Sequence, residues 1–74
     1  MTKPEEKILK EIRNAGGKGI SGSAITEATR ISAGRLYPIL YRLEREGVIG
    51  SFWEGRHVPR MRLYCFASLI PEEP

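Results

Sequence analysis

The 74-residue sequence contains no aspartate, one histidine (His57) and one cysteine (Cys65). A single cysteine excludes an internal disulfide, and one cysteine with one histidine is too small a ligand set for a zinc site. Without aspartate a complete Ser-His-Asp triad cannot form, and no glutamate has a partner at a catalytic spacing. The composition therefore argues against an enzyme, and no cofactor or metal is expected.

Long apolar runs are also missing. The only apolar pair in the first eleven residues, Ile8-Leu9, lies among charged side chains, so no signal peptide is expected. The uncharged stretch between Arg62 and Glu72 is too short to span a bilayer and contains Pro71. Together with the lone thiol, these features predict a cytoplasmic protein that does not contact a membrane.

The formal net charge of +3 is unevenly distributed. Residues 30–62 carry seven arginines against three glutamates, whereas residues 1–29 carry five basic side chains against four acidic ones. Arginine has a planar fork of donors that suits phosphates and base edges better than the lysine ammonium does. On charge alone, nucleic-acid binding and a merely solvated basic face explain this pattern equally well.

Two helices are predicted in the first half of the chain, over residues 3–15 and 22–29. The first ends at Gly16-Gly17, and Glu5 stands where a capping box needs it, three residues after a threonine. A brief strand at Ile20 precedes the second helix. The candidate capping residues are Thr2 for the first helix and Ser21 or Ser23 for the second.

A third helix is predicted over residues 32–46, between Ser32 as N-cap and Gly47 as the residue that ends it. Four apolar residues at helical spacing form one narrow stripe that should face the core: Leu36, Ile39, Leu40 and Leu43. The outward side then carries two tyrosines and three arginines, Tyr37, Tyr41, Arg35, Arg42 and Arg45. Arg45 is expected to complement the helix dipole.

Pro38 lies inside this third helix and removes the hydrogen bond to the Gly34 carbonyl. We expect a local kink or a loosened first turn. The alternative is that the helix begins at Pro38 and that residues 32–37 form a separate turn.

The last elements are two strands, residues 48–53 and 60–66, joined by an exposed tip at residues 54–59. Alternation in the second strand places Leu63 and Cys65 on the inner side, with Cys65 as an inert core thiol, and Tyr64 and Phe66 on the other side. Trp53 is expected to anchor the wing by packing. Residues 1–70 form one domain, and residues 71–74 are expected to be a frayed tail.

The order helix, helix, tight turn, helix, hairpin is that of an α+β winged helix-turn-helix fold, with three helices followed by a two-stranded antiparallel wing. In such folds the third helix enters the major groove of DNA and the wing lies over the neighbouring backbone. The arginines of this chain fall on those two elements. This coincidence favours DNA binding more strongly than charge or fold does alone.

The stretch from Gly34 to Ile49, with its Tyr-Pro inside the third helix, resembles the signature of PadR-like winged-helix transcriptional regulators. The resemblance extends over residues 19–66 and includes Trp53, Pro59-Arg60 and Leu63-Tyr64. It implies a bacterial, archaeal, phage or plasmid repressor that binds a palindromic operator as a homodimer. It also implies that Tyr37 and the helix start meet the phosphates and bases.

Members of that family continue into C-terminal helices that build the dimer, whereas this sequence ends eight residues after Phe66. We therefore expect a minimal form without the dimerisation helix and with no evident small-molecule effector. The apolar residues then left for an interface are Phe66, Leu69 and Ile70.

The predicted DNA-binding residues are Ser32, Gly34, Arg35, Tyr37, Tyr41 and Arg42 on the third helix, and Arg56, His57 and Arg60 on the wing. Either Arg35 or Arg42 would read a guanine. The competing hypothesis is a winged-helix adaptor that binds a protein partner through an apolar patch made of Tyr37, Pro38, Tyr41 and Trp53.

Overall fold

The structure is a computed structural model that describes residues 3–54 and 61–70. This part of the chain has three α-helices and three strands, joined by the 3-10 turns η1 (Gly16–Lys18) and η2 (Ala67–Leu69). The helices are α1 (Lys3–Ala15), α2 (Gly22–Thr29) and α3 (Ala33–Arg45), and the strands are β1 (Ile20–Ser21), β2 (Ile49–Glu54) and β3 (Met61–Phe66). The predicted α+β winged helix-turn-helix fold is confirmed, including the brief strand at Ile20.

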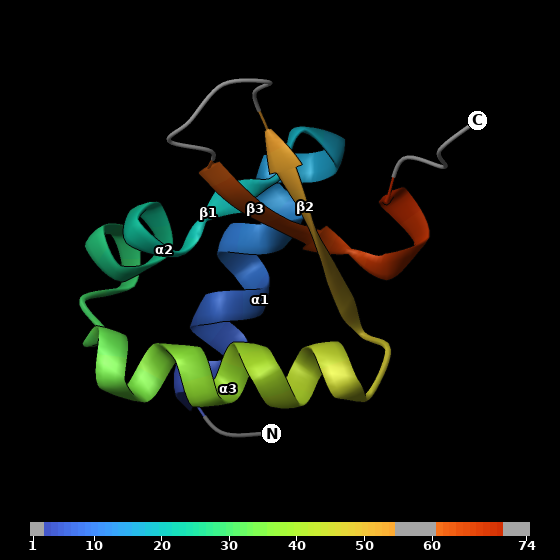
Figure 1. Ribbon diagram of the computed structural model, residues 1–74. Coiled ribbons are helices and arrows are strands. Elements are labelled where there is room, and N and C mark those ends of the chain that lie inside the picture. Colours follow the sequence, from blue (N-terminus) through green and yellow to red (C-terminus); the bar gives the residue numbers. More distant parts are fainter. Residues whose placement is uncertain (1–2, 55–60, 71–74) are drawn as a thin grey trace.

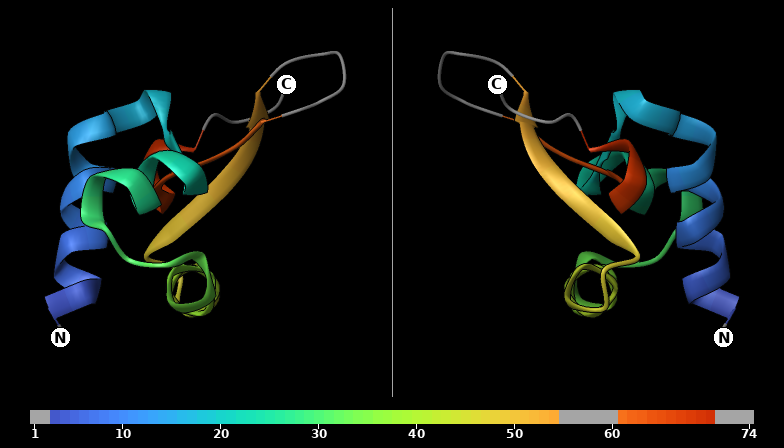
Figure 2. Two further views of the ribbon diagram at one scale, coloured as in Figure 1. Left: turned by 90° about the vertical axis from the view of Figure 1, so that its left-hand side faces the viewer. Right: turned by 90° about the vertical axis from the view of Figure 1, so that its right-hand side faces the viewer.

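The strands form one antiparallel sheet in the order β1-β3-β2. β2 and β3 pair along their whole length, from Ile49 opposite Phe66 to Glu54 opposite Met61. Figure 1 shows α3 lying across the lower end of the molecule while β2 and β3 rise away from it. In the side views of Figure 2, α1 lies on the side of the molecule away from β2.

Local side-chain and backbone chemistry sets the helix ends. Ser21 caps α2, because its hydroxyl oxygen accepts a backbone N–H three residues later at 3.2 Å. Gly47 ends α3 at a φ of 78°, a left-handed conformation that favours glycine. The following N–H, of Val48, donates to the Leu43 carbonyl at 3.0 Å and closes a Schellman turn. Thr2, the predicted cap of α1, lies outside the described residues.

The α3 helix runs continuously through Pro38. It begins at Ala33, so the alternative in which Pro38 starts the helix is wrong. Proline cannot donate to the carbonyl four residues earlier, which belongs to Gly34. Both residues are exposed, so the unpaired carbonyl is left on the solvent side of the helix rather than in the core.

The apolar stripe of α3 is the centre of the core. Leu36, Leu40 and Leu43 are buried, and Ile39 packs against them from the edge. Their partners come from every other part of the fold and include Ile8, Ile12, Ile25, Ile31, Ile49 and Tyr64. The predicted orientation of α3 is therefore confirmed: the leucines point inward, while Tyr37 and Tyr41 are 46% and 64% exposed.

Both faces of β3 carry buried side chains, which corrects the predicted alternation. Tyr64 belongs to the core beneath the helices and Phe66 packs against it, although the sequence pattern placed them on the outer side. Leu63 and Cys65 are buried as predicted, but they alternate with Tyr64 and so occupy the opposite face. That face has its own cover, because Ile70 lies directly over Gly50, the cross-strand partner of Cys65.

The packing of Ile70 and Phe66 also changes the expected dimer surface. Of the three apolar residues proposed for an interface, only Leu69 is exposed.

The wing tip, with its predicted contacts Arg56, His57 and Arg60, and the tail at residues 71–74 lie outside the described residues. In the described ranges, no helix has the length and apolar character needed to cross a membrane.

The inward leucines and outward tyrosines of α3 should differ sharply on truncation. Leu40→Ala leaves a cavity in the core and should lower the free energy of unfolding by about 2–5 kcal/mol. Tyr41→Ala, at the next position, removes a mostly exposed ring and should cost less than about 1 kcal/mol. Urea denaturation followed by circular dichroism measures both values. Similar losses for the two variants would contradict the orientation of α3.

Candidate nucleic-acid interface

The predicted interface residues of α3 lie along one exposed helix face. Ser32 occupies the N-cap position in an extended conformation, and its carbonyl accepts the N–H groups of Arg35 and Leu36 at 3.0 and 2.8 Å. The Ser32 hydroxyl itself makes no capping hydrogen bond, which leaves it available to a ligand. Gly34 and Arg35 are exposed, and a side chain at Gly34 would meet open space. The start of α3 is thus uncovered.

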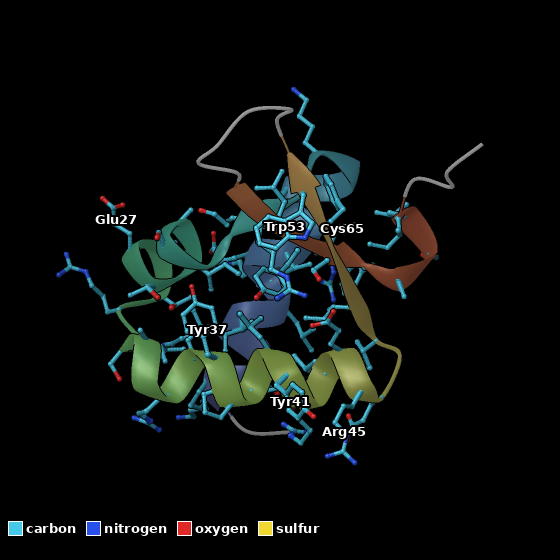
Figure 3. All side chains as sticks on the ribbon, viewed as in Figure 1. Glu27, Tyr37, Tyr41, Arg45, Trp53 and Cys65 are labelled. Atoms are coloured by element: carbon cyan, nitrogen blue, oxygen red, sulfur yellow. The ribbon has the colours of Figure 1, made fainter. Side chains whose placement is uncertain are left out.

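Tyr37 reaches sideways from α3 to the beginning of α2 (Figure 3). A methyl group at Gly22, the buried first residue of α2, would overlap the Tyr37 hydroxyl. The tyrosine ring is therefore held against the adjoining helix with almost half of its surface open. No pattern in the sequence indicates this contact, because Gly22 marks only the predicted start of a helix.

Arg42 forms ion pairs with two glutamates. Its guanidinium donates to the carboxylate of Glu5 on α1, whose side chain is only 8% exposed, and it lies 3.5 Å from Glu46 on its own helix. The hydrogen bond and the negative charge of Glu5 raise the pKa of Arg42. Arg42 thereby braces α1 against α3, and reaching a base would mean sharing or giving up these bonds.

A series of hydrogen bonds links the second half of α3 to the wing. The Ser51 hydroxyl donates to Glu44 at 2.9 Å, and the Arg62 Nε donates to Ser51 at 3.0 Å. The Arg62 guanidinium also lies 5.5 Å from the centre of the Trp53 ring, a cation–π contact. These contacts were not predicted. The only sequence feature that indicates them is the cross-strand pair of Trp53 and Arg62, and this pair can be identified only when the strand register is known.

Tyr41 and Trp53 each contact an arginine. Trp53, expected to anchor the wing by packing, is 56% exposed and is covered by Arg62. Arg45 lies in the last turn of α3, where it was expected to complement the helix dipole, and its guanidinium is 5.7 Å from the ring centre of Tyr41, toward the C-terminal end of α3 in Figure 3. Together with Glu44, residues Tyr41, Arg45 and Arg62 line a groove of about 390 Å³ between α3 and the wing.

Among residues 3–54 and 61–70, no group of three or more histidine, cysteine or acidic side chains could hold a metal ion. Burial raises the pKa of the Cys65 thiol, so the thiol stays protonated and unreactive at neutral pH. This agrees with its predicted role as a core residue.

A winged helix-turn-helix with the outer face of its third helix uncovered is the architecture of a DNA-binding domain. The family model described as the transcriptional regulator PadR-like family matches residues 8–66. The chain belongs to this family, whose members are DNA-binding transcriptional regulators rather than enzymes. A comparison with curated proteins gives no significant match.

Arg42 and Arg35 should differ in their effect on stability. Arg42→Ala leaves the Glu5 carboxylate without its arginine and should lower the midpoint of thermal unfolding. Arg35→Ala serves as the matched control, because Arg35 makes no ion pair within residues 3–54 and 61–70, and its midpoint should stay unchanged. Thermal unfolding by circular dichroism measures both. Equal midpoints for Arg42→Ala and wild type would show that the brace is not stabilising.

Proposed function

We propose that this protein binds double-stranded DNA sequence-specifically and acts as a small transcriptional repressor of the phage or plasmid type. The segment 32–46 enters the major groove, and the wing tip at residues 54–59 lies on the backbone. The observation that carries the proposal is the orientation of α3. Its leucines are buried, and the exposed side presents Arg35, Tyr37 and Tyr41.

The side chains on this face divide by chemistry. Ser32 and Tyr37 carry hydroxyls suited to phosphate oxygens, and Gly34 allows the backbone to approach closely. Arg35 is the first choice for reading a guanine, because Arg42 already bonds to Glu5. Arg42 remains the second choice, since about half of its side chain is exposed. On the wing, Arg56, His57 and Arg60 are assigned to the backbone on sequence grounds.

Two copies of the chain are needed for tight binding. A single module of this kind buries only about 600–1,000 Å² of protein surface on DNA. A homodimer on a palindromic operator doubles the contacts and matches the two-fold symmetry of its site.

A protein-binding adaptor is the second candidate, and exposed aromatic rings favour it. Tyr41 and Trp53 are both more than half exposed, and Tyr37 and Pro38 lie on the same side of α3 as Tyr41. Such a patch resembles the aromatic centre of a protein interface. Salt separates the two functions, because affinity for DNA falls steeply as salt rises, whereas an aromatic hot spot is much less sensitive.

The role of Arg35 can be tested by Arg35→Lys, which keeps the positive charge but lacks the planar guanidinium that makes a bidentate contact. A preferred duplex is first selected by the wild-type protein from a randomised pool, and a scrambled duplex of equal composition serves as reference. Arg35→Lys should lower affinity for the selected duplex about tenfold, within the range of about 1–3 kcal/mol for one bidentate base contact. Affinity for the scrambled duplex should change little. Fluorescence anisotropy measures these four dissociation constants at each of two salt concentrations.

Arg35→Ala extends the comparison, since it removes the charge as well and should weaken binding to both duplexes. Losses of equal size on the two duplexes for Arg35→Lys would refute base reading by Arg35. Failure of the wild-type protein to bind any duplex in dilute buffer would refute the proposed function and favour the adaptor.

A further inference from the structure

A basic groove lies where the start of α1 meets the turn between α2 and α3. Its volume is about 430 Å³, and four of the side chains that line it are cationic: Lys3, Lys7, Arg30 and Arg35. None of its lining residues is acidic. A second hollow of about 330 Å³ shares Lys7 and Arg30 and adds Lys10 and Glu11, so the basic surface continues along α1.

The cations of this groove have no acidic partner among the described residues. All four are exposed, and within the described residues none of them makes an ion pair. This sets them apart from Arg42 and Arg62, whose carboxylate partners lie on α1 and α3. Unpaired positive charges that converge on one hollow attract an anion. When that anion is a phosphate of nucleic acid, binding is also favoured by release of the counterions condensed on the nucleic acid.

Arg30 occupies its place at a conformational cost. It is the C-cap of α2 with a φ of 63°, and it is the only non-glycine residue with a positive φ in the described part of the chain. Glycine or asparagine is the usual choice at such a position. The strained backbone at Arg30 therefore lies at the rim of the groove, where its side chain is one of the lining cations.

The groove also contains a free hydroxyl and continues the proposed DNA-binding face. Ser32 lines it and makes no capping hydrogen bond. Arg35 lines it too and belongs to the exposed face of α3. A duplex that receives α3 in its major groove therefore brings a sugar-phosphate strand close to this hollow, where Lys3, Lys7 and Arg30 can bind a phosphodiester.

We propose that this groove binds a backbone phosphate of the duplex, with Lys3, Lys7 and Arg30 forming a phosphate clamp beside α3. The inference rests on the proposed function and extends it to α1 and to the α2–α3 turn. The clamp carries no sequence information. It contributes affinity of equal size for every duplex and fixes how α3 sits in the groove.

The test compares charge-removing variants on a duplex of mixed sequence over 50–200 mM salt. Lys7→Gln and Arg30→Gly should each reduce the slope of log affinity against log salt by about one, and their combination by about two. Arg30→Gly also removes the strained backbone, so its melting temperature should equal or exceed that of wild type. Weaker binding by this variant cannot then be ascribed to poor folding. Lys18→Gln, on η1 at the far end of α1, is the matched control and should leave the slope unchanged.

The outcomes separate the clamp from the proposed function. If Lys7→Gln and Arg30→Gly bind like Lys18→Gln while Arg35→Lys still loses discrimination, the clamp is refuted and the function stands. If Arg35→Lys keeps full discrimination while the slopes fall as expected, the clamp stands and the base contact is refuted. Inorganic phosphate provides a further arm. Millimolar phosphate binding that Lys7→Gln abolishes, with unchanged slopes on the duplex, would assign the groove to free phosphate and overturn the proposal.

Discussion

The burial of one leucine stripe fixes the orientation of α3, and the proposed DNA contacts depend on it. Leu36, Leu40 and Leu43 recur at helical spacing and are all buried against the rest of the fold. Burying each such side chain contributes about 1.5–3 kcal/mol, so rotating the helix to expose them would cost most of the stability of a small domain. The opposite face is thereby held outward, with Tyr41 at its centre.

Acidic residues then decide which of the outward cations remain available. Glu5 and Glu46 bind Arg42. Glu44 lies near Arg62, in the series of hydrogen bonds that links α3 to the wing. These pairs lie toward the second half of α3 and serve to hold α1, α3 and the sheet together. Within the described residues, Arg35 and Arg45 are the α3 arginines without an ion pair, and Arg35, at the helix start, lines the same groove as Arg30. The proposed contacts with bases and phosphates therefore centre on the N-terminal half of α3.

Local signals in the sequence predicted the fold well. The apolar period located α3, Ser21 and Gly47 marked helix ends, and the order of elements gave the winged helix-turn-helix. The period of apolar residues shows which side chains share a face of a strand, but not which other element covers that face. This explains the wrong prediction for β3. On β3 the pattern separated Tyr64 from Cys65 correctly, yet it could not show that both faces of the strand are covered. The prediction that Tyr64 and Phe66 face outward was therefore wrong, whereas the burial of Leu63 and Cys65 was predicted correctly.

Contacts between distant segments lay beyond the sequence signals. Glu5 fits a capping box three residues after Thr2, and nothing local indicates that it meets Arg42, 37 residues further along the chain. Gly22 likewise gives no hint that Tyr37 will lie against it. Sequence patterns identified the helix of the proposed interface, but the partners of its individual side chains depend on how α1 and α2 pack beside it.

The uncovered face of α3 is the surface proposed to meet DNA. Amide chemical-shift mapping of the ¹⁵N-labelled protein, titrated with a duplex in dilute buffer, locates the contact surface. The largest shifts should fall on the segment from Ser32 to Tyr41 and on the first turns of α1. Shifts confined to the sheet and η2, or no shifts at all, would contradict this proposal.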